Sequence, residues 1–278
     1  MFLFPASFVE SLLEEDLHLY DLTSLALGLE DQPGQVRAVA RGQGVAAGVE
    51  VARELFRLAG AEVEVKSPSG ASLEPGQEIL IARGPVGRLH AAYKIAQNVL
   101  EYAGGIATRT RQIVDRVKAV SEAEVLVTRK HFPGTKRLSL AAALAGGAQV
   151  HRTGLSDSIL IFDQHYQYLG GIEGLAKILP AVKKKYTERT IAVEVSSLEA
   201  ASLAAQSGAD IIQLEKFPAA ELKTVVARLK ELNPLVKVVA AGGVNADNAA
   251  DYAATGLDGL VTTWPFFGRP QDVKMAFQ

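Results

Sequence analysis

The side chains best suited to chemistry in this sequence are basic residues that follow short apolar runs. Arg129 and Lys130 come directly after EVLVT, and His151-Arg152 follows further along the chain. Residues 108–152 hold nine Lys and Arg against three Asp and Glu, although the whole protein has a formal net charge of −2. Arg presents a planar fork that suits carboxylate or phosphate oxygens, and Lys adds a compact point charge. We therefore expect Arg129, Lys130 and Arg152 to form an anion site.

Other basic residues of the same region have a simpler interpretation. Arg111, Arg116 and Lys118 fall within a helical pattern. Charge runs on helices usually belong to solvated faces. We expect these three side chains to lie on an exposed helix surface.

Two acids stand in otherwise apolar runs. Glu194 lies within IAVEV, and Glu215 ends IIQLE. An acid inside an apolar strand is costly unless its charge is paired or bound to a metal. The pair could hold Mg²⁺ or the hydroxyls of a sugar, or it could form salt bridges with the nearby basic residues. An anion site beside the acids favours the metal or sugar interpretation.

A pair of glycines follows the apolar run VKVVAA. Gly242-Gly243 precedes a helical pattern, and glycines there allow backbone N–H groups to approach a phosphate beside a helix N-terminus. In α/β barrels the loops after the last two strands often bind phosphate. In this chain those loops contain Gly242-Gly243 and Thr262-Thr263. A lone Gly-Gly is usually a tight turn, so it is the position that makes it a candidate phosphate site.

The elements that must position these residues alternate regularly. Six short β-type runs are separated by helical stretches: EVLVT, SILIF, TIAVEV, DIIQLE, VKVVAA and DGLVTT. This alternation predicts parallel βαβ units, which tend to close into a barrel when repeated with one hand. We expect a barrel-like α/β domain over residues 108–265, with its catalytic groups at the C-terminal ends of the strands.

The first 107 residues predict a smaller α+β domain. Ser7 and Glu10 form a capping-box pattern for a helix over residues 8–16, and residues 44–60 have the pattern of a second helix. A long linking helix is predicted over residues 85–104, interrupted at Gly104-Gly105 before a helix resumes. The second domain then covers residues 108–278, and we expect its C-terminal tail to return to the first domain.

Composition excludes several classes of function. The chain has no Cys, so disulfides, thiolate metal sites and Cys nucleophiles are absent. The slightly acidic net charge gives no footprint for nucleic acid or an anionic membrane surface. No apolar run approaches the ~18–20 residues of a membrane span, and the N-terminus lacks the pattern of a signal peptide. We expect a globular cytoplasmic protein.

Taken in order, these motifs resemble the quinolinate phosphoribosyltransferase (nicotinate-nucleotide pyrophosphorylase) family. The matching segments are Gly105-Ile-Ala-Thr108, Thr128-Arg-Lys130, Pro133-Gly134, His151-Arg152, Gly154-Leu155, Val193-Glu-Val195, Gly208-Ala-Asp-Ile-Ile212 and Gly242-Gly243. The resemblance implies an incomplete, open α/β barrel beside a smaller N-terminal α+β domain. It also implies a homodimer, or a higher assembly of dimers, in which the N-terminal domain of one subunit covers the barrel mouth of its partner.

The resemblance further implies an activity. Phosphoribosyl pyrophosphate, with Mg²⁺, would transfer its phosphoribosyl group to the nitrogen of quinolinate or a similar heterocycle, releasing pyrophosphate. The expected substrate-binding residues are Lys94, Arg129, Lys130, His151, Arg152 and Phe162. Glu194 and Glu215 would face the ribose and the metal, and with Lys130 they are the expected catalytic residues. The 5-phosphate would bind at Gly242, Gly243, Thr262 and Thr263.

Departures from the family pattern bear on the acceptor. Tyr93-Lys94 replaces Glu-Arg, Phe162 replaces Lys, Ala241 replaces Ser, and Glu215-Lys216 replaces Asp-Asn. A Phe in place of a Lys removes a cation and adds apolar surface, which favours a less charged or more aromatic acceptor. The altered pattern is similar to the ModD branch of the family, whose members accompany molybdate transport systems.

Two other functions compete with this one. The branch resemblance allows a non-catalytic accessory protein that binds an oxyanion such as molybdate in the basic pocket. A phosphate-binding aldolase or isomerase would need a Schiff-base Lys or a paired acid and base, and Lys130 is available for the first role. Arg129 beside it, and the order of the motifs, disfavour that third hypothesis.

Overall fold

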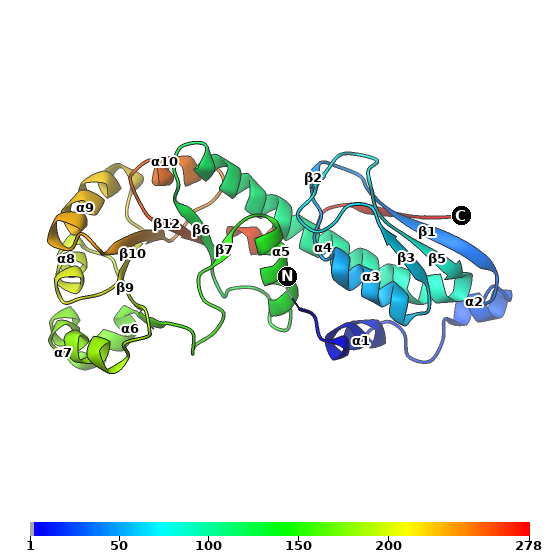
Figure 1. The fold of residues 1–278 in the computed structure, drawn as a ribbon, viewed down its shortest axis with the longest axis horizontal. Helices are drawn as coiled ribbons and strands as arrows, with labels where there is room; N and C mark the ends of the chain where they lie inside the picture. The colour runs from blue at the N-terminus through cyan, green and yellow to red at the C-terminus, as the bar shows by residue number, and fades with distance from the viewer. Residues whose placement is uncertain (1–2) are drawn as a thin grey trace. The chain divides into compact units, whose positions relative to one another are not determined.

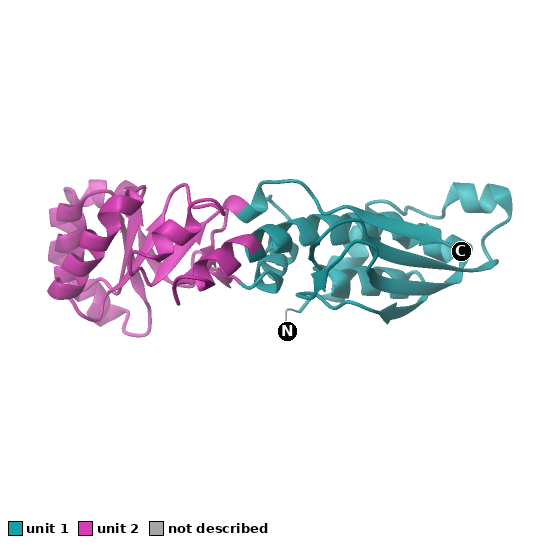
Figure 2. Ribbon diagram, turned by 90° about the horizontal axis from the view of Figure 1, so that it is seen from above, with its two compact units in different colours: residues 1–111, 131–147, 265–278 teal, residues 112–130, 148–264 magenta. Residues whose placement is uncertain are grey.

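The computed structural model describes residues 3–278, which form two compact units (Figure 2). The first unit contains the described residues up to Arg111, together with residues 131–147 and 265–278. The second contains residues 112–130 and 148–264. In the part of the chain that the structure describes, no helix is both long enough and apolar enough to cross a membrane.

The first unit is built on a four-stranded antiparallel sheet with the order β13-β1-β5-β3. The strands are β1 (Pro33–Ala40), β3 (Glu62–Val65), β5 (Glu78–Pro85) and β13 (Val273–Phe277). Its longer helices are α3 (Val49–Leu58) and α4 (Val86–Lys118), which lie along one face of the sheet in Figure 1. Leu55 and Phe56 of α3 and Leu89 of α4 are fully buried against this sheet, in one apolar core with Val36 and Leu80.

Smaller elements complete the unit. They are α1 (Ala6–Glu14), α2 (Leu22–Leu27), α5 (Lys136–Ala145) and an antiparallel pair of short strands, β2 (Gly44–Val45) and β4 (Ser72–Leu73). The predicted capping box is wrong, because α1 begins directly after Pro5, whose φ is −59°, and no side chain caps it. Ser7 therefore lies inside the first turn. The helix predicted from residue 44 begins only at Val49, after Gly48 in the left-handed conformation.

The long helix α4 is continuous over 33 residues, so the predicted interruption at Gly104-Gly105 is wrong. These glycines allow a close approach of another segment. A Cβ atom at Gly104 would lie 2.7 Å from Gln271 Oε1, and one at Gly105 would lie 2.7 Å from the carbonyl oxygen of Arg269. Gly-Gly within a helical pattern here indicates packing, not a break.

The second unit is a curved, seven-stranded sheet with the order β7-β6-β12-β11-β10-β9-β8. All neighbouring strands are parallel, and among the described residues the edge strands β7 and β8 do not pair with each other, so the barrel is open. The strands are β6 (Glu124–Val127), β7 (Gln149–Val150), β8 (Ile159–Ile161), β9 (Ile191–Val195), β10 (Ile211–Glu215), β11 (Lys237–Ala241) and β12 (Gly259–Thr262). The six predicted strands are confirmed, and β7 is an addition.

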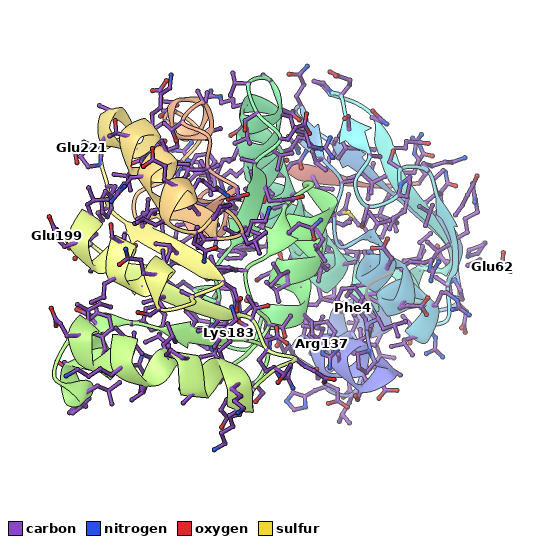
Figure 3. The ribbon with its side chains drawn as sticks, turned by 60° about the vertical axis from the view of Figure 1, so that its left-hand side comes forward. Phe4, Glu62, Arg137, Lys183, Glu199 and Glu221 are labelled. Carbon is purple, nitrogen blue, oxygen red and sulfur yellow. The ribbon has the colours of Figure 1, made fainter. Side chains whose placement is uncertain are left out.

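Helices cover the outer face of this sheet. They include α7 (Ile172–Lys185), α8 (Leu198–Gln206) and α9 (Ala219–Leu232), which follow one another along the edge of the unit in Figure 1. The inner faces of these helices carry Leu179, Ala204 and Leu222, which pack in one apolar core with residues of β9, β10 and β11. Glu199 and Glu221 lie on the opposite, exposed faces of α8 and α9 (Figure 3). Because the helices that connect successive strands return along this one face, the strands run parallel and all their C-terminal ends lie at one edge.

Candidate active site

A cavity of about 770 Å³ opens at the C-terminal ends of the parallel strands. It lies entirely within the second unit. Every strand of the sheet contributes to its lining, either with residues of the strand itself or with residues of the loop that follows the strand. The expected residues that line it are Arg129, Lys130, His151, Arg152, Phe162, Glu194, Glu215, Gly242, Gly243, Thr262 and Thr263. The structure therefore brings together all the predicted site residues but one.

The exception is Lys94. It belongs to α4 in the first unit, where its Nζ donates a hydrogen bond to Gln97 Oε1 at 2.9 Å and lies 5.2 Å from the centre of the Tyr93 ring. Arg111 and Arg116 also lie outside the cavity, and each donates to a backbone carbonyl, of Gly146 and Ala246 respectively. Arg116 is exposed, as expected for a helix surface, whereas Arg111 is half-buried and its guanidinium also donates to the carbonyl of Ala145.

One part of the cavity is positively charged. Arg152 follows β7 and is only 8% exposed, and burial, followed by the charge of Arg129, lowers its pKa. Asp157 acts in the opposite direction on Arg152. Burial, reinforced by Arg152 and Arg129, lowers the pKa of His151 to about 4. At neutral pH this region thus contains two guanidinium groups and an uncharged imidazole.

Phe162 forms an aromatic wall beside these cations. It follows β8, and the guanidinium carbon of Arg152 lies 5.8 Å from the centre of its ring. The ring stacks on His165 with 5.6 Å between centroids and 21° between planes. The backbone N–H of Phe162 donates to His165 Nδ1 at 2.9 Å, which holds this stacked pair in place.

Two carboxylates lie on neighbouring strands of the same cavity. Burial, and then the charge of Glu215, raise the pKa of Glu194. Gln213, its register partner on β10, donates an amide hydrogen bond to Glu194, and Lys130 also favours the ionised form. Among residues 3–278 neither acid makes an ion pair, so the salt-bridge interpretation is wrong.

The glycine loop after β11 borders these acids. Gly242 and Gly243 have φ values of +89° and +82°. A Cβ atom at Gly242 would lie 2.6 Å from Lys216 Cγ and 2.8 Å from Glu215 Oε1, so only glycine fits there. The predicted helix N-terminus next to the loop is wrong, because α10 (Ala249–Ala253) is a single short turn that begins six positions after Gly243. The expected phosphate site therefore rests on the backbone N–H groups of the loop alone.

Threonines at the ends of β6 and β12 close this side of the cavity. Thr128 Oγ1 and Thr263 Oγ1 lie 3.0 Å apart. The Thr262 hydroxyl donates to the carbonyl of Val244 at 2.7 Å and accepts from the N–H of Trp264 at 3.1 Å. Thr262 therefore fixes the glycine loop to the neighbouring strand.

Several residues that line the cavity were not among the predicted site residues, including Gln213 and Lys216. Gln213 lies two positions before Glu215, so both side chains point to the same face of β10. Its Oε1 is buried without a hydrogen-bond partner among the described residues. Lys216 has a φ of +58°, which is rare for a side chain of this type, and lies against Gly242. The i, i+2 spacing of Gln213 and Glu215 in an apolar run was the available signal for the first.

Comparison with known families agrees with this geometry. The family model of the quinolinate phosphoribosyl transferase N-terminal domain matches residues 21–104, and that of the C-terminal domain matches residues 106–275. The chain belongs to the quinolinate phosphoribosyltransferase family. The open barrel with a smaller antiparallel domain is the fold of this family, as the sequence resemblance implied.

Relatives of this chain within the family include a ModD protein of Rhodobacter capsulatus. It is 42% identical over 257 residues, covering 92% of this chain and 98% of the relative. The nicotinate-nucleotide pyrophosphorylase (carboxylating) of Rattus norvegicus is 32% identical, covering 91% and 84%. The structure of the nicotinate-nucleotide pyrophosphorylase from Francisella tularensis is similar in fold, with a TM-score of 0.90, 23% identity and coverage of 100% and 98%. The ModD resemblance found in the sequence is confirmed.

Proposed function

We propose that this protein transfers a phosphoribosyl group from phosphoribosyl pyrophosphate to the nitrogen of a quinolinate-like heterocycle and releases pyrophosphate. One observation carries the proposal. Two carboxylates without ion-pair partners, Glu194 and Glu215, lie in one cavity with two guanidinium groups and a positive-φ glycine loop. An anionic phosphosugar and an acidic ring need both kinds of group, whereas a simple anion site needs only the basic ones.

The acids fit a Mg²⁺ ion that is shared with the substrate. Among the described residues there is no group of three His, Cys, Asp or Glu that could hold a metal alone. Mg²⁺ is commonly bound by one or two carboxylates, with substrate phosphates and water completing its shell. Glu194 and Glu215 would hold it here, and when bound it would neutralise charge on the pyrophosphate group.

The remaining residues would act by position and charge. In this transfer the bond from the anomeric carbon to pyrophosphate breaks as the ring nitrogen approaches, so positive charge develops on the sugar. Glu194 and Glu215 would stabilise that charge and bind ribose hydroxyls. Arg129 and Arg152 would hold the acid group of the ring, and the backbone of Gly242-Gly243 would hold the 5-phosphate. Such positioning can supply much of the rate without a protein nucleophile.

A non-catalytic oxyanion carrier is the second candidate. It is favoured by Arg129, which makes no ion pair with any described residue, and by the nearly buried Arg152. The same cavity contains two carboxylates, which would repel molybdate. For that reason we rank oxyanion binding below phosphoribosyl transfer.

Calorimetric titration separates the two candidates. We expect phosphoribosyl pyrophosphate to bind in the presence of Mg²⁺, and Glu194→Gln to weaken this binding by about tenfold or more, because the variant loses one carboxylate charge. Molybdate titrated into the same samples is the control. Molybdate binding that requires Arg129 and Arg152 but ignores Glu194→Gln, without phosphoribosyl pyrophosphate binding, would support the carrier instead.

A further inference from the structure

The acceptor end of the cavity contains a fixed number of positive charges. Arg129 and Arg152 lie close enough for Arg129 to lower the pKa of Arg152. Lys130 lines the same cavity as the acids, and its charge favours the ionised form of Glu194. His151 is uncharged at neutral pH, with a pKa of about 4. Lys216, the other lysine of the cavity, lies against Gly242 at the glycine loop. Within one subunit, two guanidinium groups therefore remain for the acceptor, and a guanidinium fork binds one carboxylate through parallel hydrogen bonds.

Asp157 reduces the positive charge with which the two guanidinium groups can attract a ligand. It raises the pKa of Arg152, so part of the positive charge of Arg152 is already balanced within the protein. Asp157 Oδ2 also accepts hydrogen bonds from Thr153 N–H and Oγ1, at 2.6 and 2.7 Å, which fixes the carboxylate near Arg152. The net charge left for a ligand is thus below two.

The adjoining wall has no cation to offer. Phe162 lines the cavity beside Arg152, and His165, which does not line it, stacks on the Phe162 ring. The next cavity residue of this segment, Gln164, is neutral. Glu194 and Glu215 line the same cavity and would repel a second acid group. A second carboxylate on the ligand would therefore lose its water without gaining a cationic partner, which is costly.

We propose that the acceptor is an aromatic heterocycle with a single carboxylate, held between Arg129 and Arg152 with its ring against Phe162, and that Phe162 determines this selectivity. The proposal rests on the proposed function only in taking the bound ring acid to be the group that receives the phosphoribosyl group. The same site would bind the ring acid in the absence of the phosphosugar. A dicarboxylate ring such as quinolinate is then disfavoured in this member of the family.

The test compares two ring acids on one protein. Nicotinate has one carboxylate and quinolinate has two, on the same pyridine ring. We expect calorimetry at pH 7.5, with and without phosphoribosyl pyrophosphate and Mg²⁺, to give a dissociation constant for nicotinate about tenfold or more below that for quinolinate. Equal or tighter binding of quinolinate by the unaltered protein would overturn the proposal.

Variants at Phe162 assign the selectivity to its side chain. Phe162→Lys adds a third cation, so we expect the ratio of the two constants to shift toward quinolinate by about tenfold. Phe162→Leu keeps the site apolar but removes the aromatic ring, so both acids should bind more weakly while nicotinate stays preferred. A ratio unchanged in Phe162→Lys would contradict the role of Phe162. The ratio does not depend on the folded fraction of a sample, so a poorly folding variant remains informative.

Failure of this proposal is distinguishable from failure of the proposed function. Phosphoribosyl pyrophosphate is titrated separately into the same protein. Its binding together with a preference for quinolinate would leave the transferase intact and reject the single-carboxylate acceptor. Selective binding of nicotinate without any phosphoribosyl pyrophosphate binding would retain the ring-acid site and reject the transferase.

Discussion

Gly242 and Gly243 are adjacent, yet substitution by Ala should have different effects at the two positions. Both need positive φ, but only Gly242 has a neighbouring cation and carboxylate in the path of a Cβ atom. Gly242→Ala should displace Lys216 and Glu215 and weaken phosphoribosyl pyrophosphate binding by about tenfold or more. Gly243→Ala is the matched control, because its Cβ meets nothing within 4 Å and only the backbone strain remains. Equal losses of affinity in calorimetric titrations would contradict this account of the loop.

His151 links the charge of the cavity to stability. Its pKa of about 4 in the folded protein is below the ordinary value of 6.5, so the unfolded chain takes up the proton first as the pH falls. The stabilising contribution is therefore complete above pH 6.5 and is lost between pH 6.5 and about 4. Urea unfolding at pH 7.5 and pH 5 should show a loss up to roughly 2 kcal/mol larger in the unaltered protein than in His151→Asn. The same loss in both proteins would show that His151 is not held in its neutral form.

At the scale of elements, α4 depends on two glycines that a sequence pattern mistakes for a break. Gly105→Ala would press a Cβ atom against the backbone of Arg269 and Pro270, which cannot move aside as a side chain can. Overpacking of this kind costs about 1–3 kcal/mol, more than the gain of about 1 kcal/mol in helix propensity. Gly104→Ala meets mainly the end of the Gln271 side chain, so its thermal unfolding midpoint should fall less. A midpoint for Gly105→Ala at or above that of Gly104→Ala would contradict the close approach.

Local elements of this fold could be predicted from sequence, whereas contacts between distant segments could not. Apolar runs of five or six residues predicted β6 and β8–β12 correctly, because parallel strands covered by helices must be apolar on both faces. The two-residue strand β7 was too short to leave a pattern. The segment that packs on Gly104-Gly105 lies more than 160 positions further along the chain, which no local pattern reveals. In the cavity, residues at strand ends were predictable, whereas Gln213 depends on knowing which face of β10 points inward.

At the scale of the whole molecule, the position of Lys94 outside the cavity makes assembly testable. The family resemblance implies a dimer in which the N-terminal domain of one subunit covers the barrel of its partner, so Lys94 would serve a second copy. Lys94→Ala and Glu194→Gln should each lower the transfer activity. An equimolar mixture whose subunits exchange freely should recover up to about a quarter of it, since about half of the dimers are mixed and one of the two sites in each mixed dimer carries neither substitution. Activity that stays at the level of the separate variants after mixing would contradict a shared site.

The central claim is phosphoribosyl transfer, and the release of pyrophosphate tests it most directly. Purified protein is supplied with phosphoribosyl pyrophosphate and Mg²⁺, with and without a pyridine carboxylate, and pyrophosphate is measured over time. We expect release that requires the ring acid, with one ribonucleotide formed per pyrophosphate, and a rate about a hundredfold or more lower in Glu194→Gln. Absence of ring-dependent release with every pyridine acid, in a protein that nevertheless binds molybdate tightly, would contradict the transferase and leave oxyanion binding as the function of this cavity.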